Sequence, residues 1–204
     1  GVTIAVVDTG IDEDSPEFAG RISPFSRDMT GANRPLTGTD DHGTGVSMVA
    51  AAARNGRGIL GMAYDSTIMA LRSDTVGSCA GDGAAASETE CSFSDSTIAA
   101  AVNHAASNGA RVINISLGGE GAGAALRNAV ATAIGRGALV VIAAGNDGLA
   151  EPDSFARILD QAGDGGVIVV GSVDADGEIS SFSNRAGARN AHYMTALGSR
   201  ICCA

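Results

Sequence analysis

Short apolar runs alternate along this chain with alanine-rich runs of helical length, and this alternation is its most restrictive feature. The runs at 138–144 and 167–170 are apolar at every position, rich in Val and Ile, and preceded by glycine. Strands that are apolar throughout suit a parallel sheet that is covered on both faces. The alternation therefore predicts an α/β fold, a doubly wound, mostly parallel sheet with helices on both faces.

The expected elements follow one another in regular order, with short turns between them. Asp95 or Ser96 is a suitable N-cap for one helix, which the pair Asn108-Gly109 would end. No linker-like tract or charge block marks a second domain, so residues 1–204 are expected to form a single domain. We predict strands over 2–7, 66–71, 111–116, 139–144 and 166–170, and helices over 42–53, 97–107 and 124–135.

The composition narrows the range of partners. A formal net charge of −10 argues against nucleic acid or an anionic membrane surface, because both are polyanions. No apolar run has the length that a membrane span needs. Gly1 opens directly into the first expected strand, and residues 196–204 are an apolar stretch without a closing element, so both ends are expected to be cut.

Polar residues follow several of the expected strands. Asp8, Ser116 and Asn146 each come directly after or near the end of an apolar run, and His42 opens a helical one. Ligands of doubly wound sheets bind beyond the carboxyl ends of the strands. A carboxylate at a strand end and an imidazole at a helix start can orient and charge a general base for a nucleophile. No serine in a suitable nucleophile setting follows before Ala204.

Each of these residues also has a purely structural alternative. Asp8 could cap the turn that follows it, and His42 could cap its own helix. Asn146 could be a turn residue in the left-handed region, since it follows glycine after a buried strand. The remaining histidines, His104 and His192, are expected to be solvated or to lie on a helix surface.

Two other kinds of site are weaker hypotheses. Residues 56–61, Gly-Arg-Gly-Ile-Leu-Gly, match a dinucleotide fingerprint literally. They follow a helix and precede a strand, which is the reverse of the order that nucleotide binding requires. Ser116 lacks the first glycine of a Gly-x-Ser-x-Gly nucleophile turn, so a hydrolase of that type is a poor alternative.

The four cysteines fall into two pairs. Cys79 and Cys91 flank a polar loop rich in Gly, Ala and Ser, and we predict a disulfide between them; two ordinary thiols are the alternative. Cys202 and Cys203 are adjacent and can hardly join to each other without strain, so at least one pairs elsewhere or stays free. Their spacing does not resemble a zinc site.

Three segments together resemble the subtilisin-like serine proteases, the subtilase family. They are Val6-Val-Asp-Thr-Gly-Ile around the acid, Asp41-His-Gly-Thr-Gly around the base, and Ala143-Ala-Gly-Asn-Asp around an oxyanion-hole asparagine. Residues 112–119 look like the family's substrate-binding strand, and residues 180–184 resemble the strand before its last catalytic segment. The similarity covers nearly the whole chain and implies a subtilisin-like fold.

The resemblance implies a role for each matched residue. Asp8 would accept a hydrogen bond from the His42 ring, and Asn146 would donate its amide to the oxyanion that develops during attack. Substrate would add as a strand along Ser116, Leu117 and Gly118. The pocket for the residue before the scissile bond would be lined by Gly118, Gly119, Ala143, Ala144 and Gly145.

The nucleophile segment of the family, Gly-Thr-Ser, is missing from these residues. Residues 200–204 look like the approach to it, so the serine is expected one or two dozen residues beyond Ala204. The resemblance thus implies a serine endopeptidase whose isolated 204 residues are C-terminally incomplete, inactive and marginally stable. The alternative is a non-catalytic pseudoprotease, or a fragment that binds peptides along residues 116–119 without cleaving them.

Finer features depart from the common family pattern. Gly45 replaces a second histidine, and Met48 replaces a glycine.

The most similar variety within the family is the passenger domain of bacterial autotransporters. This resemblance implies a secreted or cell-surface protein.

A cofactor is not expected, and calcium is the one metal worth testing. Glu17 and Asn55 occupy positions that can help bind calcium in the family. Arg54 and Arg57 crowd that loop, so no metal ligand is assigned.

Overall fold

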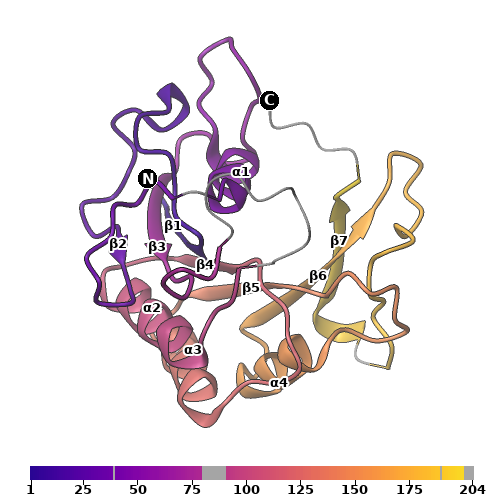
Figure 1. Cartoon of the computed structure of the whole chain (residues 1–204). Coiled ribbons are helices and arrows are strands. Elements are labelled where there is room, and N and C mark those ends of the chain that lie inside the picture. Colours follow the sequence, from indigo (N-terminus) through magenta and orange to yellow (C-terminus); the bar gives the residue numbers. More distant parts are fainter. Residues whose placement is uncertain (39, 80–90, 189, 200–204) are drawn as a thin grey trace.

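The computed structural model describes residues 1–38, 40–79, 91–188 and 190–199. Its centre is a seven-stranded sheet with the order β2-β3-β1-β4-β5-β6-β7, and every pairing of neighbouring strands is parallel. The predicted doubly wound α/β fold is confirmed (Figure 1). The strands are β1 (Thr3–Asp8), β2 (Arg27–Asp28), β3 (Thr67–Arg72), β4 (Val112–Ile115), β5 (Leu139–Ala143), β6 (Val167–Val173) and β7 (Tyr193–Leu197).

Helices cover both faces of the sheet, as the alternation of strands and helices predicted. On the face of α1, Ile4 and Val6 of the central strand pack into one core with Ala51. On the opposite face, Ala5 and Val7 belong to a larger core built with the other three α-helices. The helices are α1 (His42–Ala51), α2 (Asp95–Ser107), α3 (Ala124–Gly135) and α4 (Ser154–Ala162), with 3-10 turns η1 (Pro16–Phe18) and η2 (Asn190–His192).

The two faces are covered unequally. In β5, Val140 and Ile142 are fully buried under the larger core, whereas Leu139, Val141 and Ala143 are only half-buried on the α1 face. This strand is therefore covered less completely on the α1 face than its apolar run suggests. The reason is that α1, the one α-helix on this face in the described part of the chain, packs on β1 and β3.

Several elements were missed or misplaced from the sequence. β2, α4 and β7 were not predicted, and residues 180–184, which resembled a strand, form turns instead. The N-cap of α2 is Ser94, whose hydroxyl accepts from Thr97 N at 3.2 Å, and not Asp95 or Ser96. The same helix ends at Asn108, as predicted. No helix in the described ranges is both long and apolar enough to cross a membrane.

Candidate active site

Asp8 is the last residue of β1, which lies between β3 and β4 in the middle of the sheet. The residue is 1% exposed. Its Oδ1 accepts hydrogen bonds from Thr9 N at 2.7 Å and from His42 Nδ1 at 2.8 Å. Its Oδ2 is buried with no hydrogen-bond partner among the described residues. The carboxylate is thus fixed by the sheet and directed at one imidazole.

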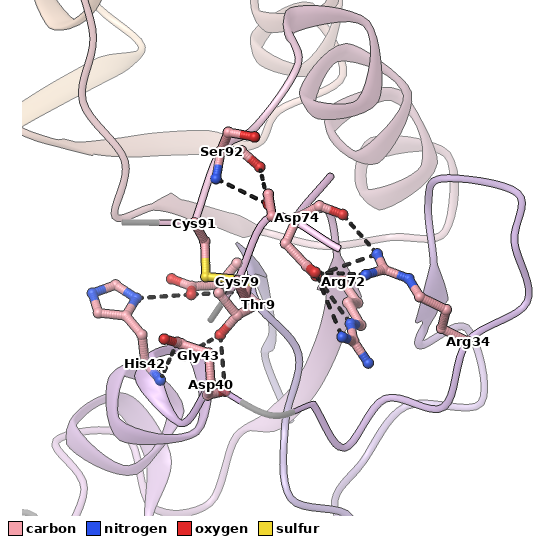
Figure 2. Close-up of a disulfide and its surroundings, with 12 residues drawn as sticks. Thr9, Arg34, Asp40, His42, Gly43, Arg72, Asp74, Cys79, Cys91 and Ser92 are labelled. Atoms are coloured by element: carbon pink, nitrogen blue, oxygen red, sulfur yellow. Dashed lines mark hydrogen bonds and ion pairs between the residues drawn. A yellow bond between two sulfur atoms is a disulfide. The ribbon is translucent and has the colours of Figure 1, made fainter. Parts of the chain in front are cut away.

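His42 is the first residue of α1, and two backbone hydrogen bonds place it there. His42 N donates to Asp40 Oδ1 at 2.9 Å, and Gly43 N donates to Thr9 Oγ1 at 3.0 Å (Figure 2). A Cβ at residue 43 would collide with the carbonyl oxygen of Gly10. The helix can therefore begin against the turn that follows β1 only because residue 43 is glycine.

The electrostatics of the pair favour a charged ring. The hydrogen bond to Asp8 raises the pKa of His42, burial opposes this, and the negative charges of Asp8 and Asp40 raise it further. The side chain remains 54% exposed, so the ring still faces solvent. With Nδ1 donating to Asp8, the other ring nitrogen is left to exchange protons with a group in front of it.

A cleft of about 300 Å³ opens in front of this ring. It joins residues from the ends of β1, β4 and β5, as expected for a parallel sheet. Asn146 is exposed there, and its side chain makes no hydrogen bond to the described residues. Two rim residues, Cys91 and Phe93, also line it. The lining residues are Thr9, Asp40, His42, Cys91, Phe93, Ser116, Leu117, Gly118 and Asn146.

The structure does not place every expected substrate residue in this cleft. Ala143, Ala144 and Gly145 line a separate cavity of about 230 Å³, which Asn146 shares, on the side of β6 and β7. Gly119 lines a third cavity, of about 740 Å³. The residues expected to form one pocket thus divide between neighbouring hollows.

Asp153 connects the segment that follows β4 with the turn that follows β5, and it was not predicted from the sequence. Its backbone N donates to Ala144 O at 2.9 Å, and its Oδ2 accepts from Gly119 N at 3.2 Å. Its Oδ1 caps α4 by accepting from Ala156 N at 2.8 Å. Burial raises the pKa of Asp153, although the two backbone N–H groups partly oppose this. The residue fixes the spacing between the segment that follows β4 and the turn that follows β5.

The rim of the cleft carries the predicted disulfide. Cys79 and Cys91 are bonded, with their Cα atoms 4.3 Å apart (Figure 2). The two arms also pair through Thr75 N, which donates to Ser92 O at 2.8 Å. Cys202 and Cys203, whose pairing was left open, lie outside the described residues.

A buried ion cluster lies behind this rim. Arg34 contacts Asp28 at 3.1 Å. Figure 2 shows the contacts with Asp74, which Arg34 approaches to 2.5 Å and Arg72 Nε to 2.9 Å. Burial alone would raise the pKa of Asp28, but hydrogen bonds from Arg34 and Thr30 hold it well below its usual range. The backbone of Asp74 also forms an isolated antiparallel β-bridge with Phe93, which lines the cleft. The ion cluster therefore supports the cleft wall.

The calcium hypothesis gains no ligand set from the structure. Glu17 Oε2 accepts from Ala53 N at 3.1 Å, and Asn55 Oδ1 accepts from Arg57 N at 2.9 Å, so both side chains are already engaged. Within the described ranges, no three His, Cys, Asp or Glu side chains are grouped to hold a metal. We therefore assign no residue to calcium.

The glycines at 56–61 lie in the loop between α1 and β3. Nucleotide binding needs such glycines between a strand and the helix that follows it. This segment leads out of a helix and into a strand, so it does not form the strand-to-helix turn of that motif.

The prediction for the other histidines was incomplete. His104 is half-buried, and its Nε2 lies 2.8 Å from Phe25 O. His192 is also half-buried, and its Nδ1 lies 2.8 Å from Asp160 Oδ1. Both partners are distant in the sequence, so no local pattern indicated them.

Fold and cleft together define a class of protein: an α/β domain with a carboxylate-bound imidazole at the carboxyl edge of its parallel sheet. The sequence model of the subtilase family, peptidase family S8, matches residues 1–198, and the chain belongs to this family.

Two characterised relatives show the extent of the similarity. The thermophilic serine proteinase of Bacillus sp. strain AK1 is 37% identical over 188 residues, which are 90% of this chain and 41% of that protein. Thermitase of Thermoactinomyces vulgaris is 34% identical over 184 residues, which are 90% of this chain and 59% of that protein. The chain thus spans roughly half the length of these relatives.

Solved structures agree with this assignment. A cold-adapted subtilisin-like serine proteinase superposes with a TM-score of 0.76 at 29% identity, covering 98% of this chain and 64% of the other. A protease of Pseudoalteromonas arctica PAMC 21717 gives a TM-score of 0.76 at 28% identity, with 99% and 64% coverage. About a third of each of these structures has no counterpart in residues 1–204.

Proposed function

We propose that this chain supplies the acid, the base and the oxyanion-binding group of a serine endopeptidase. One observation carries the proposal: the 2.8 Å hydrogen bond from His42 Nδ1 to Asp8 Oδ1, at a cleft that also contains Asn146. Membership of the subtilase family supports it. In this proposal residues 1–204 belong to a single catalytic domain, and its nucleophile is not among them.

The chemistry follows from the geometry of the pair. With Nδ1–H donated to Asp8, the Nε2 of His42 takes the proton of a serine hydroxyl as its oxygen attacks the peptide carbonyl carbon. Asp8 stabilises the imidazolium that results, and the Asn146 amide donates to the carbonyl oxygen as it becomes negative. The imidazolium then gives its proton to the leaving amine. The attacking serine is supplied from outside residues 1–204.

Substrate binding is assigned to the segment that follows β4. Ser116, Leu117 and Gly118 line the cleft beside His42, so an extended peptide can add to them as a strand. Gly118, Gly119 and residues 143–145, which line neighbouring cavities, are proposed to enclose the side chain before the scissile bond. Asp153 holds these two segments together.

We also propose that the protein acts outside the cell. The Cys79–Cys91 disulfide supports this, because such bonds persist in oxidising compartments. The passenger domain of an autotransporter is the more specific form of the proposal. Cell fractionation of the producing organism tests it, and retention of the protein with reduced cysteines in the cytoplasm would contradict it.

Active-site labelling tests the enzymatic proposal. The 204-residue chain and the longer gene product are each treated with a fluorophosphonate, and the labelled peptide is located by mass spectrometry. We expect label on a serine beyond residue 204, lost in the His42→Ala variant, and no label on the short chain. Label on Ser116 would overturn the assignment, because its hydroxyl would then be the nucleophile.

A non-catalytic peptide-binding module is the second candidate. Ser116 is the observation that favours it. Ser116 is the one serine among the described residues that lines the cleft, and its Oγ accepts a hydrogen bond from Asn114 Nδ2 at 2.8 Å. The partner of this hydroxyl is thus an amide and not a general base. Binding of a peptide aldehyde by the longer product without any labelling would support this module. Hydrolysis by that product would exclude it.

A further inference from the structure

The turn that carries Asn146 is held from behind by one buried side chain, that of Asn184. Asn184 is 0% exposed. Its Nδ2 donates to Ala144 O at 3.1 Å, two residues before Asn146. Its Oδ1 accepts from Asp147 N at 3.1 Å and from Leu149 N at 2.9 Å, just after Asn146. One amide group thus binds the backbone on both sides of the exposed Asn146.

The backbone of Asn184 is fixed in turn. Its N–H donates to Gly145 O at 3.0 Å, and its carbonyl oxygen accepts from the Tyr193 hydroxyl at 2.7 Å. Tyr193 begins β7, and its hydroxyl fills the space that a Cβ at Gly171 of β6 would need. The anchor of the turn is therefore the β6–β7 side of the sheet.

Gly145 shows how closely the turn and Asn184 fit together. Its φ is +103°, in the region that side-chain-bearing residues rarely adopt. A Cβ at this position would collide with Asn184 Nδ2. The turn before Asn146 thus adopts a backbone form that only glycine allows, directly over the Asn184 amide.

We propose that Asn184 is a positioning residue for the oxyanion-binding amide of Asn146. The inference rests on the proposed function, because it assumes that Asn146 donates to a substrate oxyanion. Asn146 has no hydrogen bond of its own to the described residues, so its position depends on the backbone that Asn184 holds. A donor displaced by about 1 Å loses much of its stabilisation of the transition state.

A double-mutant cycle in the longer, nucleophile-bearing protein tests this coupling. We expect Asn184→Ala to lower kcat by about tenfold to a hundredfold with KM nearly unchanged, because the lost contact acts on the transition state. In an Asn146→Ala background the same change should cost less than about twofold. An equal loss in both backgrounds, or a change in KM alone, would overturn the proposal.

Asn184→Asp tests the donor end of the amide. The carboxylate keeps the two accepted bonds from Asp147 N and Leu149 N but cannot donate to Ala144 O. Its second oxygen would instead face the Ala144 carbonyl oxygen in a fully buried position, so we expect kcat to fall at least as far as in Asn184→Ala. An Asp variant with the kcat of the parent would contradict the assigned bonding.

Ser180→Ala is the matched control for a general loss of stability. Ser180 is 5% exposed in the same segment and bonds to Ser172 Oγ at 2.7 Å, away from the turn. It should lower the melting temperature without changing kcat. A loss of kcat like that of Asn184→Ala would mean that any damage to this segment acts on the cleft, and would overturn the specific role.

Amide hydrogen exchange in the 204-residue chain provides a test without catalysis. We expect Asp147 N and Leu149 N to be protected in the parent and to exchange at least about tenfold faster in Asn184→Ala. Unchanged protection would overturn the role of Asn184 in the turn. If the longer parent protein shows no hydrolysis, the proposed function fails, while this measurement still decides whether Asn184 holds the turn.

Discussion

Two histidine–aspartate pairs in this molecule have the same contact and different surroundings. In each pair the Nδ1 of the histidine lies 2.8 Å from an aspartate Oδ1. His42 and Asp8 face a cleft that also contains Asn146, whereas His192 lines none of the cavities described above. A hydrogen-bonded pair is therefore not a site by itself. Its chemistry depends on what the second ring nitrogen meets.

The position of the aspartate explains the difference. Asp8 ends β1, an inner strand of the sheet, and the segment that follows the neighbouring strand β4 lines the same cleft. Asp160 lies within α4, and its partner His192 lies in η2, just before β7. That second pair joins a peripheral helix to a peripheral strand. Its position at the edge of the sheet indicates a structural role.

The largest difference between the pairs is expected in catalysis. Asp8→Asn in the longer protein keeps the shape of the side chain but removes its charge and its control of the His42 tautomer. We expect kcat/KM to fall by about 10⁴-fold. Asp160→Asn should leave kcat/KM within about twofold of the parent, because independent distant sites do not couple. Comparable losses in the two variants, measured with one peptide substrate, would show that the pairs are not functionally different.

Two glycines of α1 test how closely this helix approaches the turn that follows β1. Gly43→Ala should destabilise the fold by about 2 kcal/mol, because the added Cβ meets the Gly10 carbonyl oxygen. Gly45→Ala is the matched control, since an added Cβ there meets no atom of the described residues within 4 Å. It should be neutral or stabilising by up to about 1 kcal/mol, given the better helix propensity of Ala. Urea unfolding measures both, and equal effects would contradict the close approach.

The titration of His42 should respond to the loss of its own partner, Asp8, and not to the loss of the remote Asp160. Its pKa is raised by Asp8, so we expect Asp8→Asn to move the midpoint of the ring signals in NMR to lower pH. Asp160→Asn should leave the His42 midpoint in place.

A raised folded pKa also has a defined effect on stability. The contribution of the His42–Asp8 contact is fully present below the pKa of an unfolded histidine. It is lost as pH rises through the folded value. A base must be neutral, so kcat/KM should rise over that same upper range. A His42 midpoint that does not move in Asp8→Asn would contradict this coupling.

The sequence predicted the local parts of the site better than the long-range ones. Asp8 and His42 were recognisable because a strand end and a helix start are local features. The contacts of Asn184 and Asp153 join segments about 40 and 34 positions apart, so no spacing pattern could reveal them. His192 was expected to be solvated or on a helix surface for the same reason, because its partner lies 32 positions earlier.

The same distinction holds for the elements of the fold. The apolar strands and the alanine-rich helices were predicted within a few residues. α4 was missed because its buried apolar residues, Phe155, Ala156 and Leu159, form no continuous apolar run, although their helical spacing was a signal present in the sequence. β7 was missed because its side chains are mostly exposed, so that its strand form depends on pairing with β6.

The smallest expected effect is on stability at the second pair. His192 is 41% exposed, so water competes for its contact with Asp160, and Asp160→Asn should cost no more than about 1 kcal/mol. Asn can still accept a hydrogen bond from the ring, whereas Asp160→Ala cannot, so the Ala variant should be the less stable of the two. Urea unfolding with an unchanged m-value measures this. Loss of cooperative unfolding in Asp160→Asn would instead mean that the pair holds β7 to the sheet, and the structural role of this peripheral contact would be larger than its exposure implies.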